Sequence, residues 1–297
     1  MNIPKLSIVF LNYNRITETR YTINQLFSLV EQRQDVEVIA IDNNSNDGTG
    51  DFLKTQENWV KVINMPSNEG IAGYNEGFKQ AKGDYILVLD DDSHPLDNVT
   101  LDRIIQCLDT RPDVGIVACQ IESVKGELTY TWHLPKNNVP GPSMAFVGCG
   151  FAIRRSLFEK IGWYPADFFL YQNEMEVAIQ VMRHNYKIHY DPCCRVVHRQ
   201  SPQGRTSWRQ VYYPTRNTIW LIRRYFPFPI AAYLITSRLF FGLIRALQSL
   251  EFTCYYKAVT DALYTPIKPQ ILSPAQRKEL TTFWRQNSIF HHIIKRL

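Results

Sequence analysis

The segment Gly83-Asp84-Tyr85-Ile86-Leu87-Val88-Leu89-Asp90-Asp91-Asp92-Ser93-His94-Pro95 indicates the fold of this chain. Four apolar residues follow Tyr85, a run typical of a central strand in a parallel sheet. Three carboxylates then stand at the carboxyl end of that strand, where open α/β sheets bind ligands. Like charges this close repel, so we expect a compensating partner, and a divalent cation carrying phosphate oxygens is the natural candidate. The alternative is a solvated acidic loop.

Apolar strand patterns alternate with helical patterns through the first ninety residues. This order predicts a Rossmann-like α/β fold, with a mostly parallel sheet and helices on both faces. The turn Asn12-Tyr13-Asn14-Arg15 lacks the G-x-G-x-x-G motif, and the sequence has no G-x-x-x-x-G-K-[ST] motif, so neither familiar phosphate loop is present. We expect strands over 6–11, 37–41, 60–64 and 86–89, and helices over 15–30, 50–56 and 71–81.

The net charge of +5 hides a strong asymmetry along the 297 residues. Residues 195–297 hold 16 Lys and Arg against 3 Asp and Glu, a net charge of +13, whereas the remainder sums to −8. Between Asp191 and Glu251 there are nine Arg, no Lys and no acidic residue. Because the guanidinium group is a planar fork that suits phosphate, we expect this part to face phosphates of a ligand or a membrane.

The cysteines and the start of the sequence favour a cytoplasmic protein. No basic segment followed by an apolar one opens the chain, as a secretory signal would. The six cysteines include no C-x-x-C pair, and the adjacent Cys193 and Cys194 could bridge each other only with strain. We therefore expect reduced thiols. Residues 1–224 are expected to form the catalytic domain and 225–297 a helical, basic and aromatic extension.

The longest apolar stretch is Ile230–Leu250, and it carries Arg238 and Arg245 on one helical face. Two arginines make a membrane-spanning helix costly. An amphipathic helix lying on the inner face of a membrane fits better. The alternative is a helix that packs on the catalytic domain or on a second subunit of a homodimer.

Six separated segments form a recognisable series along the chain. Together they resemble a family 2 glycosyltransferase with the GT-A fold, and the last two resemble its rhamnosyltransferase-like branch. The resemblance covers about residues 5–225 and rests on the order of the six. The segments are Ser7-Ile8-Val9-Phe10-Leu11-Asn12-Tyr13-Asn14-Arg15, Ile39-Ala40-Ile41-Asp42-Asn43-Asn44-Ser45-Asn46-Asp47-Gly48-Thr49, Asn68-Glu69-Gly70-Ile71-Ala72-Gly73-Tyr74-Asn75-Glu76-Gly77, Asp90-Asp91-Asp92, Val196-Val197-His198 and Tyr212-Tyr213-Pro214-Thr215-Arg216-Asn217.

The resemblance implies a pocket for a nucleotide sugar. Asp42 would accept the imide N–H of uracil or thymine, although it could simply cap a helix. Asn12 and Tyr13 would line the same base pocket, with ordinary packing as the alternative for Tyr13. Asn75 and Asp90 would approach the ribose.

The resemblance also implies a site for Mg²⁺ or Mn²⁺. Asp92 would ligate the metal, which bridges the diphosphate. Asp91 belongs to the same nucleotide-sugar group, but pleating directs its side chain across the sheet. His198 would touch the metal or the diphosphate, unless it is structural. Arg216 would contact the diphosphate, with a solvated basic face as the alternative.

An inverting transferase needs a base that deprotonates the acceptor hydroxyl. In the segment Tyr171-Gln172-Asn173-Glu174-Met175-Glu176, Glu174 falls where the family has an Asp, and Asn173 replaces the Glu before it. The longer Glu must shift the base geometry. A position in a first helical turn favours the ionised carboxylate. Glu176 is the main rival as base, and both glutamates could simply offset the helix dipole.

The sequence therefore predicts a metal-dependent, inverting glycosyltransferase. Its donor would be a dTDP- or UDP-sugar, with dTDP-rhamnose a plausible case. Its acceptor would be a saccharide or lipid-linked saccharide of a bacterial surface polysaccharide such as O-antigen, and no nucleic acid would be bound. Two alternatives are a nucleotidyltransferase that makes nucleotide sugars and a non-catalytic protein that binds phosphate or nucleic acid.

Overall fold

The computed structural model describes residues 3–129, 138–200 and 206–286. The chain forms two compact units. The first comprises Met1–Asp167 and Val177–Ser201, and the second comprises Phe168–Glu176 and Pro202–Leu297. The expected domain boundary after residue 224 falls inside the helix Ser207–Tyr225, which belongs wholly to the second unit.

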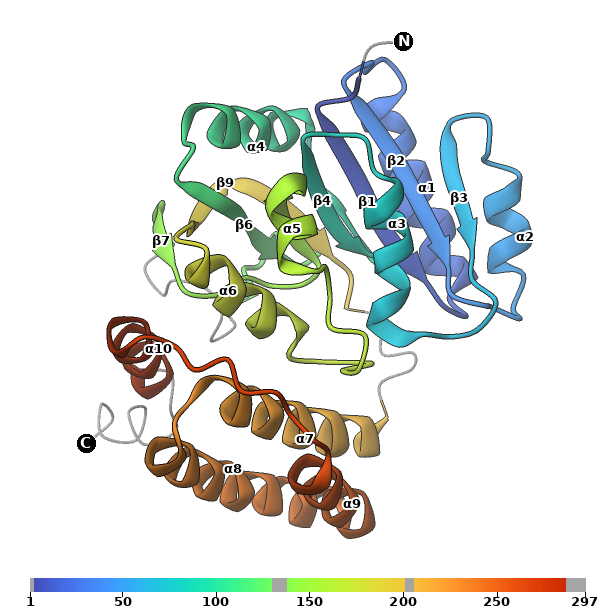
Figure 1. The fold of residues 1–297 in the computed structure, drawn as a ribbon. Coiled ribbons are helices and arrows are strands. Elements are labelled where there is room, and N and C mark those ends of the chain that lie inside the picture. Colours follow the sequence, from blue (N-terminus) through green and yellow to red (C-terminus); the bar gives the residue numbers. More distant parts are fainter. Residues whose placement is uncertain (1–2, 130–137, 201–205, 287–297) are drawn as a thin grey trace. The chain divides into compact units, whose positions relative to one another are not determined.

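Within the described residues, nine strands of the first unit form one sheet (Figure 1). Their order is β3-β2-β1-β4-β8-β6-β9-β5, and β7 pairs with β9. The expected α/β architecture is confirmed: β3, β2, β1 and β4 are parallel neighbours. β8 runs antiparallel between β4 and β6, whereas β6 and β9 are parallel. The strands are β1 (Leu6–Asn12), β2 (Val36–Asp42), β3 (Val60–Asn64), β4 (Tyr85–Asp90), β5 (Ser93–Pro95), β6 (Val114–Glu122), β7 (Gly141–Ser143), β8 (Gly150–Arg154) and β9 (Lys187–His198).

Helices cover both faces of this sheet. Ile23 of α1 and Leu101 of α4 belong to the apolar core on one face, which α2 also covers. Phe78 of α3, Phe158 of α5 and Val181 of α6 belong to the core on the other face. Burial of these side chains fixes each helix against the strands. The helices are α1 (Ile16–Val30), α2 (Thr49–Lys54), the short η1 (Gly70–Gly73), α3 (Tyr74–Gln80), α4 (Asn98–Thr110), α5 (Arg155–Ile161) and α6 (Asn173–Arg183).

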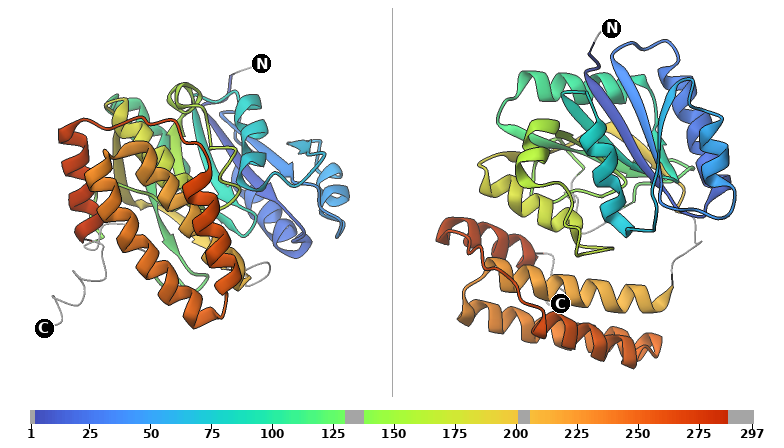
Figure 2. Two further views of the ribbon diagram at one scale, coloured as in Figure 1. Left: turned by 60° about the horizontal axis from the view of Figure 1, so that its bottom comes forward. Right: turned by 45° about the vertical axis from the view of Figure 1, so that its right-hand side comes forward.

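Among the described residues, the second unit contains the first residues of α6 and four further helices. Two of them, α8 and α9, pack on α7 (Figure 2). A Cβ atom on Gly242 of α8 would lie 2.9 Å from a ring carbon of Tyr255 and 3.2 Å from Oγ1 of Thr215, so this glycine allows the three helices to pack closely. The four helices are α7 (Ser207–Tyr225), α8 (Phe228–Ser249), α9 (Phe252–Tyr264) and α10 (Pro274–Gln286).

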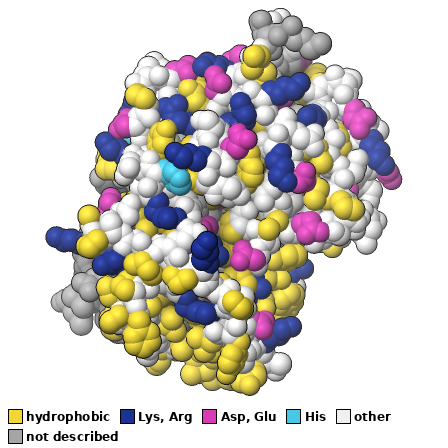
Figure 3. Space-filling model, in the orientation of Figure 1, with side chains coloured by type: hydrophobic (Ala, Val, Ile, Leu, Met, Phe, Trp, Pro, Cys, Tyr) yellow, Lys and Arg dark blue, Asp and Glu magenta, His cyan; other side chains and the backbone are white. Residues whose placement is uncertain are grey.

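Helix α8 corresponds to the apolar stretch that the sequence singled out. Among the described residues it is the one helix that is long and apolar enough to cross a membrane, a criterion that core helices of soluble proteins also meet. Only 11% of its apolar window is buried. Figure 3 shows hydrophobic side chains gathered over the part of the second unit that α8 and α9 form.

Candidate active site

The carboxyl ends of β1, β2 and β4 bring three of the expected site residues to one edge of the sheet. In the strand register, Asn12 lies opposite Asp42, and Leu11 lies opposite Asp90. Parallel strands end at the same edge, so their terminal side chains gather there. The register of the sheet therefore brings Asn12, Asp42 and Asp90 to the same edge.

The residues expected around the base differ in their exposure. Asn12 is fully buried, donates to the carbonyl of Ile41 at 3.0 Å and accepts from Thr19 at 2.9 Å. Its amide therefore holds β1, β2 and α1 together. Asp42 is 6% exposed, and both its carboxylate oxygens lie 3.3 Å from the backbone N of Ser45. Tyr13, at 36% exposure, is the most open of the three.

The acidic triplet is compensated by an arginine from the turn after β1. Nη1 of Arg15 donates to Asp91 at 2.6 Å, and Nη2 donates to Asp92 at 2.8 Å. Asp90 instead accepts a hydrogen bond of 3.1 Å from the hydroxyl of Tyr74. We expected a metal ion to balance these charges, and the fold supplies part of the balance itself. Arg15 belongs to the first motif quoted from the sequence, but the sequence did not predict that Arg15 pairs with Asp91 and Asp92.

The end of β9 closes the triplet from the other side. Nε2 of His198 lies 3.1 Å from Oδ1 of Asp92. The next residue, Arg199, donates to Glu18 at 2.6 Å and to the carbonyl of Asp91 at 3.1 Å. Arg199 was missed by the sequence analysis, although it follows His198 directly in the acid-free stretch.

Burial and these contacts shift the pKa values of the three carboxylates in different directions. Burial, followed by the charge of Asp92, raises the pKa of Asp90. Burial raises the pKa of Asp91 well above its ordinary value despite the opposing charge of Arg15. For Asp92, burial acts in the same upward direction, but hydrogen bonds and charge from His198 and Arg15 outweigh it and lower the pKa. Of the three carboxylates, Asp92 is the one whose ionised form these surroundings favour.

Asn75, expected near the ribose, makes two backbone contacts. Its Nδ2 donates to the carbonyl of Tyr164 at 3.0 Å, and its Oδ1 accepts from the N–H of the same residue at 3.1 Å. These bonds pin α3 to the segment after α5. Both the nitrogen and the oxygen of the Asn75 amide are therefore hydrogen-bonded to the backbone of Tyr164.

In the second unit, an irregular segment precedes α6. Phe169, Tyr171 and Gln172 all have positive φ, between 60° and 68°, although none is glycine. Such backbone costs of order 1–3 kcal/mol per residue and persists only where other contacts hold it. Nδ2 of Asn217 supplies them, because it lies 3.1, 2.8 and 2.9 Å from the carbonyl oxygens of Phe168, Leu170 and Tyr171.

Arg216 supports the same segment. Its Nη2 donates to the carbonyl of Phe168 at 2.9 Å, and its guanidinium lies 4.2 Å from the ring centre of Trp220. Stacking of this kind is favourable for arginine. The diphosphate contact predicted for Arg216 would have to share the guanidinium with these partners.

The two candidate bases in the first turn of α6 have different surroundings. Glu176 is 6% exposed, accepts a 2.5 Å hydrogen bond from Tyr225 and pairs with Arg224 at 3.1 Å. Glu174 is half-buried in the same turn. The rival base thus takes part in a buried ion pair, which gives it a structural role.

The family model of glycosyl transferase family 2 matches residues 7–175, and the chain belongs to this family. It is 26% identical over 228 residues to the probable glycosyltransferase YdaM of Bacillus subtilis, a match that covers 70% of this chain and 54% of that protein. It is 21% identical over 230 residues to the O-antigen biosynthesis protein RfbC of Myxococcus xanthus, which covers 68% of this chain and 18% of that protein. The chain thus spans about half or less of these relatives.

A solved structure shares the fold. The mannosyltransferase PcManGT of Pyrobaculum calidifontis, solved with GDP-Man and Mn²⁺, superposes with a TM-score of 0.60 at 16% identity, covering 98% of this chain and 83% of that one. The likeness confirms the GT-A fold predicted from the sequence.

Proposed function

We propose that this protein is an inverting glycosyltransferase that moves a sugar from a nucleoside diphosphate sugar to an acceptor hydroxyl. The observation that carries the proposal is the acidic edge of the sheet in a family 2 chain. There Asp42 ends β2, and Asp90 and Asp92 stand at the end of β4, the two parallel strands that flank β1. Family membership favours this reaction over nucleotide-sugar synthesis and over simple binding of phosphate or nucleic acid.

The metal proposed for the site is Mg²⁺ or Mn²⁺. Asp92 and His198 would hold it, because an ionised carboxylate and an imidazole already lie 3.1 Å apart there. When bound, a divalent metal neutralises the charge that develops on the leaving diphosphate. Arg15 would keep the second oxygen of Asp92 in place, so that the carboxylate is oriented before any metal binds.

The proposed base is Glu174. A base must be ionised and able to reach the acceptor. Glu176 is committed to Arg224 and Tyr225. Asn217 and Arg216 would act as positioning residues, because they hold the segment that leads into the first turn of α6.

The proposed donor is a dTDP- or UDP-sugar, with dTDP-rhamnose among the candidates. A carboxylate such as Asp42 can accept the imide N–H of thymine or uracil. The proposed acceptor is a saccharide or a lipid-linked saccharide of a bacterial surface polysaccharide. The likeness to an O-antigen biosynthesis protein supports this context.

We further propose that the protein is cytoplasmic and associates peripherally with the inner face of a membrane through α8 and α9. Phe228, Tyr233, Phe240 and Leu247 on α8 are each more than half exposed, and Tyr256 on α9 is 71% exposed. An apolar surface of this kind, with arginines and no acid along α8, fits an anionic lipid interface. The alternative is that a second copy of the chain covers these helices in a homodimer.

A turnover assay tests the reaction. The purified chain, Mn²⁺ and a panel of UDP-, dTDP- and GDP-sugars are incubated with a lipid-linked saccharide extract, and release of nucleoside diphosphate is measured. One donor should be consumed with inversion at its anomeric carbon. A panel without any metal-dependent turnover would contradict the proposal.

A further inference from the structure

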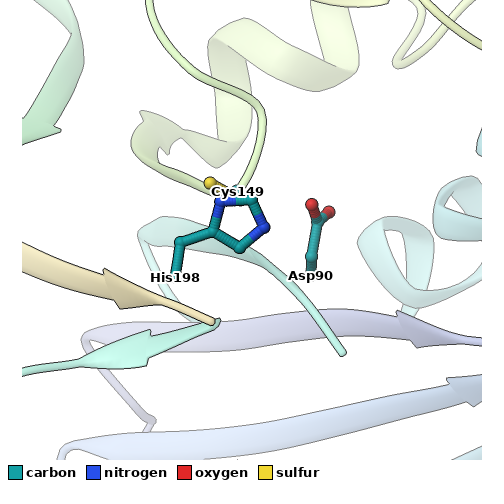
Figure 4. A group of neighbouring side chains, drawn as sticks. All are labelled: Asp90, Cys149 and His198. Carbon is teal, nitrogen blue, oxygen red and sulfur yellow. The ribbon is translucent and has the colours of Figure 1, made fainter. Parts of the chain in front are cut away.

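Three side chains of different chemistry meet beside the acidic triplet. Leu89 of β4 lies opposite Gly150 of β8 in an antiparallel register. The next residue after Leu89 and the one before Gly150 are therefore neighbours, and these are Asp90 and Cys149. His198 joins them from the end of β9. One ligand atom from each of the three lies within 4.8 Å of the others, and Figure 4 shows the imidazole between the sulfur and the carboxylate.

We propose that Asp90, Cys149 and His198 form a binding site for a thiophilic divalent cation of the zinc class. Zn²⁺ takes thiolate, imidazole and carboxylate ligands at roughly 2.0–2.3 Å, so the ligand atoms of one ion lie about 3–4 Å apart. The ligand atoms of this group lie within 4.8 Å of one another, so the side chains would have to draw closer when a cation binds. Mg²⁺ prefers oxygen ligands alone, so the thiol of Cys149 distinguishes the two classes of metal.

The contact between His198 and Asp92 is of a kind found at zinc sites. A zinc-bound histidine donates its second ring N–H to a carboxylate. Nε2 of His198 lies 3.1 Å from Asp92, which leaves Nδ1 to face the cation. Cys149 is 2% exposed, so bulk water has little access to its sulfur. When the cation binds, the thiol of Cys149 releases its proton to solvent and the thiolate becomes the ligand. Three protein ligands leave a fourth position open.

The site has a consequence for the reaction, and this consequence rests on the proposed function. His198 is the imidazole that we assign with Asp92 to the metal of the donor diphosphate. When a zinc ion is held by Asp90, Cys149 and His198, the imidazole of His198 can no longer ligate the metal of the donor diphosphate. Zinc should therefore inhibit transfer in competition with Mn²⁺, and the inhibition should depend on Cys149.

Cobalt binding tests the site without any donor or turnover. The full chain is titrated with Co²⁺ alone, which replaces Zn²⁺ in such sites and reports thiolate ligation through a charge-transfer band in the near ultraviolet. We expect one equivalent of Co²⁺ to produce this band. Cys149→Ser should abolish it, whereas Cys193→Ser, which removes an exposed thiol elsewhere on β9, should leave it unchanged.

Two further variants keep the test decisive. His198→Asn should prevent stoichiometric binding, and it carries the test if Cys149→Ser does not fold. Asp92→Asn should weaken Co²⁺ binding by about 10–100-fold, the usual effect of removing a carboxylate that orients a ligand. A wild-type protein without the band, or a band that persists in folded Cys149→Ser, would overturn the proposal. Because no nucleotide sugar is present, a failed turnover assay would leave this result unaffected.

Discussion

The acidic edge of the sheet and the segment before α6 fix their functional side chains in opposite ways. At the sheet edge, strand register places Asp90 at the end of β4, and ionic contacts from Arg15 and His198 hold Asp91 and Asp92 directly after it. The segment 168–172 has no such register. It carries three non-glycine residues with positive φ and depends on side-chain bonds to its carbonyl groups. The position of a carboxylate at a strand end can be predicted from the sequence, because the apolar strand pattern precedes it. The backbone of a strained segment cannot be predicted in this way.

The largest expected effect is at the sheet edge. Asp92→Ala removes the ionised carboxylate that pairs with Arg15 and His198, so metal-dependent transfer should fall below detection. The measurement is release of nucleoside diphosphate in the presence of Mn²⁺, with wild type in EDTA as a parallel loss. Asp113→Ala is the matched control, because that carboxylate forms an exposed pair with Lys187. Full activity of Asp92→Ala would remove this residue from the metal site.

Next in size is the contrast between the two glutamates of α6. Glu174→Gln should lower kcat by about 10²–10⁴-fold, the usual contribution of a general base, while donor binding stays unchanged. Glu176→Gln should instead destabilise the protein by about 3–5 kcal/mol, because it leaves Arg224 without its buried partner. Kinetics and thermal unfolding of both variants decide the matter. An inactive, stable Glu176→Gln beside an active Glu174→Gln would reverse the assignment.

A smaller effect is expected from the support of the strained segment. Asn217→Leu keeps a similar volume but removes the donor that serves three carbonyl groups. A catalytic group misplaced by about an ångström can cost up to about 100-fold, so kcat should drop while the KM for the donor changes little. Steady-state kinetics with varied donor measure this. A change confined to KM would mean that Asn217 serves donor binding.

The smallest effect concerns the exposed helices. In flotation assays the protein should bind anionic liposomes at low salt, since arginines near an anionic surface contribute about 1 kcal/mol each. Binding should weaken at high salt, and carbonate should release it. Phe240→Glu, on a side chain that is 57% exposed, should reduce binding by placing a charge in the apolar face. If the protein forms a stable dimer that does not bind liposomes, α8 belongs to a subunit interface instead.

Much of the first unit could be predicted from the sequence. The apolar runs before Asp42 and Asp90 predict central strands, and these strands end at the two aspartates in the structure. The direction of β8 could not be predicted, because an apolar run reads the same in a parallel and an antiparallel strand. The pairing of Arg15 with two aspartates depends on its side-chain conformation. The positive φ of Phe169 and Tyr171 follows from tertiary contacts of Asn217, since neither residue type signals such a backbone.

Isothermal titration calorimetry with nucleoside diphosphates tests the central claim most directly. UDP, dTDP and GDP are titrated into the wild-type chain and into Asp92→Ala, each with and without Mn²⁺. The account predicts that UDP or dTDP binds wild type at least about tenfold more tightly with Mn²⁺, a difference of about 1.4 kcal/mol, and that Asp92→Ala loses this gain. Equal binding of all three nucleotides, or a metal gain that survives in Asp92→Ala, would contradict a donor site at the acidic edge of the sheet.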